Sequence, residues 1–313
     1  MFMKKILLTA AGTATTWHLC KIIESYFKND FDIFLTDTNE KKFVPAGIFT
    51  DHFFQVPSVF DNNYLPAMHK IIKENDIDII IPLIDFDLFY FPKDSKELKE
   101  LNIVSTAPPL KTVETLTDKK KMHDFLQKNN IPTPNLYHRS NLKDSQEYII
   151  KPQKGFGSRG VEKLLGKEAK NLTDDNLIFQ EVCRPAEITA EVYNGDKLKI
   201  FQRKRVETKA GVCTKMEPVF HKQIDDSIKK LVSSIECPTA FCIQFMQNQQ
   251  DNWCITDCNL RIGAGTALST KIGFQLTRAL LASLSGKEIK DDFFSIDPSI
   301  KSVLRVYDEV IIK

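Results

Sequence analysis

Oxygen-bearing side chains alternate near the end of one predicted strand, and their types suit a divalent cation. Asp257 and Asn259 lie two residues apart, and Arg261 follows two residues later. Because successive side chains of a strand point to opposite faces, we expect these three to share one face. Carboxylate and amide oxygens are ligands that Mg²⁺ accepts, and a guanidinium binds phosphate oxygens well. The alternative is a solvated polar sheet face that binds nothing.

A predicted hairpin brings a further amide to this group. Ala240–Gln247 and Trp253–Asn259 have the composition of two strands, and the polar residues 248–252 between them suit a hairpin loop. With the turn centred between positions 250 and 251, Gln244 lies across from Asp257. We therefore expect Gln244, Asp257 and Asn259 to form an oxygen-rich cluster for Mg²⁺. The same alternation places Cys254, Thr256 and Cys258 on the opposite face.

A second group of residues has the composition of a phosphate-binding loop. Residues 151–160 contain three glycines, a hydroxyl and cations. Glycines permit a tight loop whose N–H groups can point at phosphate oxygens. The spacing of a Walker A loop is absent, and a glycine loop is as often a plain hairpin turn. The residues concerned are Gly155, Gly157, Gly160, Ser158, Lys151 and Arg159.

The turn after the first predicted strand invites a dinucleotide interpretation. Residues 10–15 lie between that strand and a helix, where a dinucleotide-binding fold holds phosphate. However, Gly12 is the one glycine where the fingerprint needs three. We therefore favour a structural strand–helix turn at this position.

The elements that carry these groups change character along the chain. In the first third, apolar strands alternate with amphipathic helices, which predicts a parallel sheet covered by helices. The expected strands are 5–9, 31–36, 77–82 and 103–105, and the expected helices are 16–27, 65–75 and 94–101. The pattern of predicted elements changes after two consecutive prolines, so we place a domain boundary near residue 112.

The remaining two thirds favour an α+β arrangement with antiparallel hairpins. A helix begins with Thr117 or Asp118 as its cap and ends at residues 129–130. The strands expected after it are 148–151, 177–182, 188–193 and 197–203, followed by the two of the hairpin described above.

Composition excludes several classes of protein. The chain has 313 residues, of which 42% are hydrophobic and 27% charged, with a formal charge of +2. This balance gives no reason to expect a nucleic-acid partner or a membrane surface. No apolar run approaches the roughly 20 residues of a membrane span, and the short stretch 6–11 is better explained as a buried strand than as a signal peptide. Seven scattered cysteines without CxxC spacing indicate reduced thiols and a cytoplasmic protein.

Together these segments resemble the ATP-grasp superfamily, specifically its carbamoyl-phosphate-synthase-like carboxylate–amine ligase branch. The resemblance covers nearly the whole chain and rests on the order and spacing of its motifs. They are residues 81–85 (IPLID), 117–119 (TDK), 131–134 (IPTP), 151–160, 179–182 (FQEV), Glu187, 203–211 and 257–261 (DCNLR). It implies a Rossmann-like front domain over residues 1–112 and an ATP-grasp domain over 113–313. Within the latter, 113–183 would be a mobile nucleotide-covering lobe and 184–313 a metal-binding, catalytic lobe.

The resemblance also implies roles for individual residues. Lys119 and Lys151 would contact the ATP phosphates, and residues 155–160 would close over them. The backbone of Gln180, Glu181, Val182 and Cys183 would receive the adenine edge, and Glu187 the ribose hydroxyls. Gln244, Asp257 and Asn259 would bind Mg²⁺, with Mn²⁺ as a substitute. Arg261 and Arg205 would stabilise charge on the transferring phosphoryl group and the acyl phosphate.

The sequence departs from the family pattern at two positions. Asp257 stands where a glutamate is usual, one methylene shorter, and residues 185–186 replace a glycine commonly found before Glu187. The shorter carboxylate could weaken metal chelation.

The expected activity is an ATP-dependent ligase that activates a carboxylate as an acyl phosphate and joins it to an amine. Its partners would be small amino-acid or amino-sugar type substrates, and a homodimer is an expectation from the family. Two alternatives stay open: a nucleotide-binding regulatory protein without turnover, and carboxylate or carbamate phosphorylation as half of a split synthase.

Overall fold

Five parallel strands form the sheet of the front domain, in the order β3-β2-β1-β4-β5. They are β1 (Lys4–Leu8), β2 (Phe31–Asp37), β3 (Phe53–Gln55), β4 (Ile79–Ile81) and β5 (Val104–Ser105). The helices are α1 (Ala14–Tyr26), α2 (Tyr64–Glu74), α3 (Asp87–Tyr90) and α4 (Lys96–Glu100), with short 3₁₀ turns at Lys41–Phe43 and Pro45–Phe49. The computed structural model describes residues 3–155, 160–306 and 308–312. The predicted parallel α/β sheet is confirmed, although the short β3 was not expected.

Alternate side chains of β1 explain why helices cover both faces of this sheet. Ile6 and Leu8 pack with Leu19 of α1, whereas Leu7 packs with Met68 of α2 on the other face. Such a buried parallel strand needs apolar residues on both sides. At the end of β2, Thr36 and Asp37 are buried polar residues.

Gly12 in the turn before α1 is needed for packing. Its N–H donates to Asp37 Oδ2 (2.7 Å), and a Cβ at this position would lie 3.1 Å from the same oxygen. Asp37 also accepts from Asn39 Nδ2 (2.8 Å), so its carboxylate stabilises this turn. The geometry supports the structural interpretation of residues 10–15.

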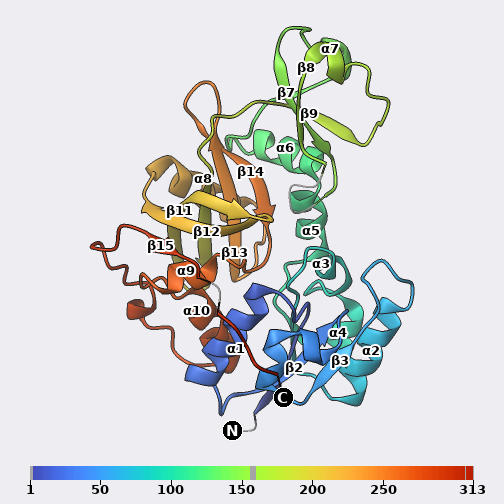
Figure 1. Cartoon of the computed structure of the whole chain (residues 1–313), viewed down its shortest axis with the longest axis vertical. Helices are drawn as coiled ribbons and strands as arrows, with labels where there is room; N and C mark the ends of the chain where they lie inside the picture. Colours follow the sequence, from blue (N-terminus) through green and yellow to red (C-terminus); the bar gives the residue numbers. More distant parts are fainter. Residues whose placement is uncertain (1–2, 156–159, 307, 313) are drawn as a thin grey trace.

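Antiparallel strands build the rest of the chain, as predicted. A six-stranded sheet has the order β14-β13-β10-β11-β12-β15, and a four-stranded sheet has the order β6-β9-β7-β8. Figure 1 shows the small sheet at the top, the large sheet in the middle and the front domain at the bottom. The large sheet comprises β10 (Ile188–Asn194), β11 (Leu198–Lys209), β12 (Val212–Val219), β13 (Ala240–Gln247), β14 (Trp253–Asn259) and β15 (Val303–Leu304). The small sheet comprises β6 (Leu136–Tyr137), β7 (Glu147–Pro152), β8 (Glu162–Leu165) and β9 (Leu177–Glu181).

The expected helix from residue 117 is the second of two consecutive helices. The helices of this part are α5 (Leu110–Thr117), α6 (Lys119–Lys128), α7 (Gly166–Ala169), α8 (Lys222–Ser234), α9 (Thr266–Thr270) and α10 (Leu276–Ser285). A last 3₁₀ turn spans Asp291–Phe293, and another spans Arg139–Asn141. Asp118 caps α6, because its side chain accepts from the N–H groups of Lys120 and Lys121.

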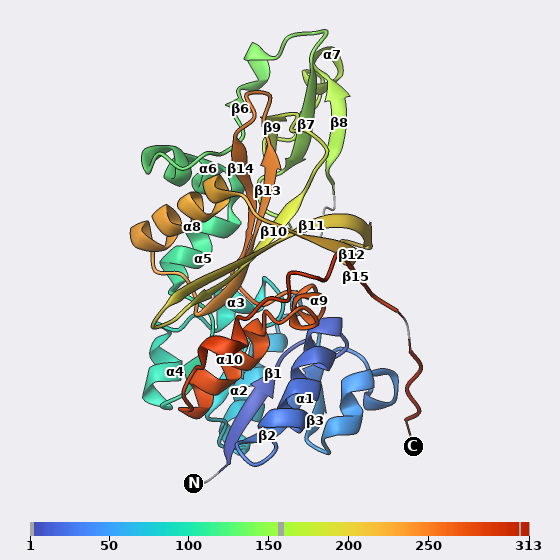
Figure 2. The same cartoon turned by 90° about the vertical axis from the view of Figure 1, so that its left-hand side faces the viewer.

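One hydrophobic core joins the front domain to the end of the chain. Ile6 and Leu19 of the front domain share a cluster with Leu276 and Leu280 of α10, and Figure 2 shows α10 lying beside α1. The small sheet instead has its own core around Tyr148 and Phe179. This division fixes the front domain against the large sheet and leaves the small sheet as a separate lobe.

Candidate functional site

The hairpin of β13 and β14 carries the predicted polar cluster. Gln244 pairs directly with Asp257, and Cys242 pairs with Asn259. Directly opposed residues of antiparallel strands point to the same face. The predicted juxtaposition of Gln244, Asp257 and Asn259 on one sheet face is therefore confirmed.

A β-bulge at Thr256 produces this register. On the loop side of the hairpin Phe245 pairs with Ile255, so Thr256 is the extra residue between two paired positions. The loop itself is centred on Gln250. It is closed by a hydrogen bond from the N–H of Asn248 to the carbonyl oxygen of Asn252 (3.0 Å). The turn centre predicted from sequence, between residues 250 and 251, was thus wrong by half a residue. The extra residue Thr256 restores the predicted pairing of Gln244 with Asp257.

The bulge also moves one side chain. Thr256 lines the same cleft as Asp257, whereas strict alternation placed it on the other face. Ile255 and Cys258 pack in the core beneath the sheet. The prediction for Thr256 was wrong because two successive residues of a bulge can face the same side. It was also wrong for Cys254, which pairs with Met246 of the cleft wall and therefore shares the face of Gln244.

The polar face continues across the neighbouring strands. Thr189 of β10 pairs with Gln244 on one side and with Arg203 of β11 on the other. Asp257, Gln244, Thr189 and Arg203 therefore form one row across four strands. Strand spacing of about 4.8 Å makes this row roughly 14 Å long between its end backbones.

Two lysines face this row from the small lobe. Lys151 of β7 is 7% exposed, and burial lowers its pKa to about 8, with the Lys119 cation adding to the effect and Asp257 opposing it. Lys119, the first residue of α6, donates from Nζ to the carbonyl oxygen of Gly155 (3.1 Å). Burial also raises the pKa of the Asp257 carboxyl, and both lysines and Arg261 oppose that rise. Cations are thus concentrated around one carboxylate.

These groups enclose a cleft of about 290 Å³ between the small and large sheets, which we call the interlobe cleft. Its apolar wall includes Ile149, Val161 and Met246, and its polar rim includes residues of both lobes. The predicted site residues that line it are Lys119, Lys151, Gly155, Gln180, Glu181, Cys183, Glu187, Gln244 and Asp257. An apolar wall with convergent polar groups is the usual setting of a ligand.

Glu187, Arg205 and Gln244 form a network at the floor of the interlobe cleft. Arg205 Nη1 donates to Glu187 Oε1 (2.5 Å), and its Nη2 donates to the carbonyl oxygen of Gly211 (2.7 Å). In the amide orientation that satisfies both neighbours, Gln244 donates to Glu187 Oε1 (3.2 Å) and accepts from Arg205 Nη1 (2.8 Å). The amide oxygen of Gln244 is therefore engaged by a guanidinium.

A second cavity of about 430 Å³ lies between the large sheet and the front domain, and we call it the interdomain cavity. Residues 13–15 after β1 and residues 83–85 after β4 line its front-domain wall. These are the carboxyl ends of two adjacent strands from which the chain leaves in opposite directions, the usual ligand site of an open α/β sheet. Arg205, Asn259 and Arg261 line the opposite wall, and Asp257 borders both cavities.

Comparison with known families matches both parts of the chain. A model described as PylC-like, N-terminal domain, matches residues 6–106, and a model described as ATP-grasp domain matches residues 116–265. The chain thus contains an ATP-grasp domain, preceded by a PylC-like N-terminal domain. A sequence comparison with curated proteins finds no match.

Solved structures share the ATP-grasp fold over nearly the whole chain. N5-carboxyaminoimidazole synthetase from Staphylococcus aureus, complexed with ADP, has a TM-score of 0.71 at 13% identity, covering 92% of this chain and 79% of that one. The biotin carboxylase domain of the Hydrogenobacter thermophilus 2-oxoglutarate carboxylase, in complex with MgADP and bicarbonate, has a TM-score of 0.75 at 13% identity, covering 95% and 73%. L-amino acid ligase from Bacillus licheniformis has a TM-score of 0.71 at 14% identity, covering 95% and 78%.

The donor set of this ATP-grasp chain partly fits Mg²⁺. Asp257 and Asn259 supply a carboxylate and an amide oxygen on one face, and Mg²⁺ takes few protein ligands because it keeps waters and binds nucleotide phosphates. Gln244 is already bound to Arg205 and Glu187. In the described part of the chain, no group of three or more His, Cys, Asp or Glu side chains could hold a metal by itself. Asp257 and Asn259 therefore fit an Mg²⁺ ion whose other ligands are waters and nucleotide phosphates.

The other predicted residues fall outside both cavities or outside the described residues. Gly160 packs against Pro152 with φ of 69°, a conformation that favours glycine. The carbonyl oxygen of Val182 accepts from Gln249 Nε2 (2.7 Å). Gly157 and Ser158 lie outside the described residues.

Sequence reasoning assigned no role to three residues of the cavity walls, although Asp85 and Arg203 lie within the motifs 81–85 and 203–211. Asp85 binds Arg261 through Oδ1 (2.9 Å) and Oδ2 (3.4 Å), and its position directly after a buried strand was the available signal. Arg203 and Thr189 were missed because β11 and β10 had no predicted register. The row of paired strands brings them to the site.

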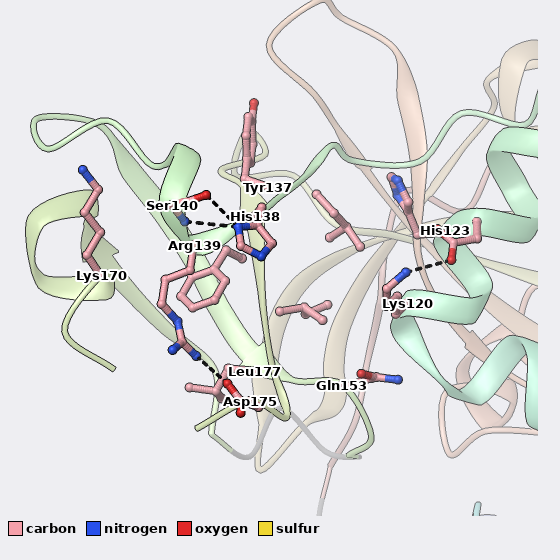
Figure 3. Close-up of a pocket in the computed structure, with 14 residues that line it drawn as sticks. Lys120, His123, Tyr137, His138, Arg139, Ser140, Gln153, Lys170, Asp175 and Leu177 are labelled. Atoms are coloured by element: carbon pink, nitrogen blue, oxygen red, sulfur yellow. Dashed lines mark hydrogen bonds and ion pairs between the residues drawn. The ribbon is translucent and has the colours of Figure 1, made fainter. Parts of the chain in front are cut away.

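A larger cavity of about 850 Å³ lies apart from this site, between α6 and the strands β6 and β9. Figure 3 shows Lys120 and His123 of α6 on one side and Tyr137 and Arg139 on the other. Its cations have carboxylate partners: Lys120 pairs with Asp124 (3.0 Å), Arg139 with Asp175 (3.5 Å) and Lys170 with Asp144 (2.6 Å). Each of these three cations is thus compensated by a carboxylate among the described residues.

None of the helices in the described residues is long and apolar enough to cross a bilayer.

Proposed function

We propose that this ATP-grasp protein is an ATP-dependent ligase that activates a carboxylate as an acyl phosphate and joins it to an amine. The observation that carries the proposal is Asp257, which borders both the interlobe cleft and the interdomain cavity. A phosphoryl group held there would face a nucleotide on one side and a second substrate on the other. The L-amino acid ligase from Bacillus licheniformis has the same fold as this chain, which supports this reaction class.

The interlobe cleft suits the nucleotide. Lys119 and Lys151 would bind the phosphates, the backbone of residues 180, 181 and 183 would receive the adenine edge, and Glu187 would bind the ribose hydroxyls. Two hydrogen bonds to Asn135 fix the position of Glu181. Its Oε1 accepts from the N–H of Asn135 (2.8 Å), and its own N–H donates to the carbonyl oxygen of Asn135 (3.0 Å).

The interdomain cavity suits the carboxylate and the amine. A carboxylate oxygen attacks the γ-phosphorus, the bond to the β–γ bridging oxygen breaks, and ADP leaves. The amine nitrogen then attacks the acyl carbon, phosphate leaves with the bonding electron pair, and the nitrogen loses a proton. Phosphoryl transfer needs in-line positioning and charge neutralisation more than covalent help from the protein.

The chain supplies this neutralisation with few groups. Arg261 lies beside Asn259 on the cavity wall and would stabilise the transferring phosphoryl group. Arg205 would act at the border of the two cavities, where Glu187 and the carbonyl oxygen of Gly211 orient it. Asp257 and Asn259 would hold Mg²⁺, which when bound neutralises negative charge on the phosphates.

The test is release of ADP and phosphate with pairs of carboxylates and amines drawn from amino acids and amino sugars. We expect turnover with at least one pair, and its loss in Asp257→Ala combined with Asn259→Ala. Asp226→Ala, on the exposed face of α8, is the matched control and should retain turnover. ATP binding without release of phosphate on the whole panel would instead favour a nucleotide-binding regulatory protein. Amine-independent ADP formation would favour carboxylate phosphorylation.

A further inference from the structure

Arg203 is a buried cation with unused hydrogen-bonding capacity. It is 4% exposed, and its Nε donates to Glu191 Oε1 (2.9 Å). Glu191 Oε1 also accepts from Ser269 Oγ (2.8 Å), whereas Glu191 Oε2 has no hydrogen-bond partner in the described residues. Arg203 Nη1 likewise has no acceptor there. A buried charged donor without an acceptor is destabilising, and an anionic ligand would supply that acceptor.

The guanidinium of Arg203 lies at the wall of the interdomain cavity, beneath Gly265. A Cβ on Gly265 would lie 2.0 Å from Arg203 Nη2, so only glycine leaves room for the guanidinium in this position. Each of these three arginines of the cavity is paired with a carboxylate, Arg205 with Glu187, Arg261 with Asp85 and Arg203 with Glu191. Among them, only Arg203 keeps a buried guanidinium nitrogen, Nη1, that has no partner in the described part of the chain.

The N-terminus of α1 adds a second source of positive potential to the same cavity. Residues 13–15 line the front-domain wall, and the first turn of this 13-residue helix contains no acidic residue. The first N–H groups of a helix lack intrahelical acceptors and attract anions. His18 of this helix contacts Thr270 of α9 through Nε2 (3.2 Å), and Leu19 packs in the core shared with α10.

We infer that the carboxylate substrate carries a second anionic group, carboxylate or phosphate, which binds at Arg203 in the interdomain cavity. This inference rests on the proposed ligase function. Arg203 and Asp257 end the same row of paired strands, roughly 14 Å apart at their backbones, and both line the interdomain cavity. The reacting carboxylate would lie near Asp257 and the second anion near Arg203.

The experiment measures binding to the MgADP-loaded protein by titration calorimetry. L-glutamate is compared with L-glutamine, and O-phospho-L-serine with L-serine, so each anionic compound has a neutral partner. We expect at least one anionic compound to bind about tenfold or more tightly than its partner, which is the scale of a charged hydrogen bond. A preference within the glutamate–glutamine pair would identify the second anion as a carboxylate. A preference within the phosphoserine–serine pair would identify it as a phosphate.

Two variants assign the preference to Arg203. Gly265→Ala displaces the guanidinium without changing charge, and Gly263→Ala is the matched control, because its Cβ would meet only Cys242 Sγ, at 3.6 Å. Arg203→Lys keeps a cation for Glu191 but loses the planar fork. We expect the preference to fall in Gly265→Ala and Arg203→Lys and to persist in Gly263→Ala, with ADP affinity unchanged in all three.

The inference is overturned if both neutral partners bind as tightly as the anions, if neither anion binds, or if the preference survives in Gly265→Ala. Failure of the ligase proposal would look different. Turnover of neutral substrates without a preference for anions would leave the ligase standing and overturn this inference. A preference for anions without any ADP formation would overturn the ligase proposal and leave the anion site at Arg203 standing.

Discussion

Asp85 of the front domain and Arg261 of the large sheet form a two-pronged ion pair across the interdomain cavity. Arg261 Nε lies 2.9 Å from Asp85 Oδ1, and Nη2 lies 3.4 Å from Oδ2. Both side chains are mostly buried. The front domain therefore orients the guanidinium that we place beside the transferring phosphoryl group.

Removing the charge of Asp85 should impair turnover more than nucleotide binding. In Asp85→Asn one prong of the pair is lost, and Arg261 gains freedom to leave its position. We expect kcat to fall about tenfold, the scale of a charge-assisted hydrogen bond, with ATP affinity unchanged. Asp76→Asn, at an exposed front-domain carboxylate, is the control. Steady-state kinetics with equal kcat in both variants would show that Asp85 does not position Arg261.

Lys151 should have opposite effects on stability and on nucleotide affinity. Burial lowers its pKa to about 8, which shows that the folded protein disfavours its charge. Lys151→Met should therefore leave the free energy of unfolding unchanged or raise it, while ATP affinity falls about tenfold or more. Thermal unfolding and calorimetry check the two effects. Lys121→Met, exposed on α6, should change neither; an ATP affinity retained in Lys151→Met would contradict the phosphate assignment.

His18 should make the fold sensitive to acid. Burial lowers its pKa from 6.5 to about 4, and Lys21, Arg305 and Lys271 add to the effect. Because the unfolded chain binds the proton more readily, stability falls as pH drops from about 6.5 to about 4, by up to about 3 kcal/mol. His18→Gln, which can keep a bond to Thr270, should lose less stability over this range. Urea unfolding at several pH values measures the difference, and identical slopes for both proteins would contradict it.

The turn between β11 and β12 should tolerate a stabilising substitution. Ala210 has φ of 47° and Gly211 φ of 78°, so both central residues are in the left-handed region. Asn-Gly is the favoured pair for such a turn, and Ala210→Asn should raise the free energy of unfolding by about 0.5–1 kcal/mol. Urea unfolding checks this value. A loss of stability would mean that Ala210 is not strained.

The sequence predicted the order of elements better than their pairing. The apolar runs of the front domain identified its buried parallel strands, because both faces must be apolar there. Strand β12 was not expected, and Pro218 within it is a residue that argues against a strand in a sequence. The pair Gln244–Asp257 was obtained although the turn centre was wrong, because the bulge at Thr256 restores the register. Bulges depend on cross-strand packing, which one strand's sequence does not show.

The predicted site shows the same limit. Asp257, Asn259 and Arg261 could be grouped from spacing two within one strand. Arg203 could not, because its place depends on the registers of β10 with β11 and with β13. Its unused Nη1 is likewise a property of the folded chain.

Trapping of the acyl phosphate tests the central claim most directly. The protein is incubated with ATP, Mg²⁺, hydroxylamine and each carboxylate of the panel, and the hydroxamate and ADP formed are quantified. We predict hydroxamate in amounts equal to ADP with at least one carboxylate, and none with the Asp257→Ala, Asn259→Ala double variant. ADP formed without hydroxamate, or no hydroxamate from any carboxylate by a protein that binds ATP, would contradict carboxylate activation.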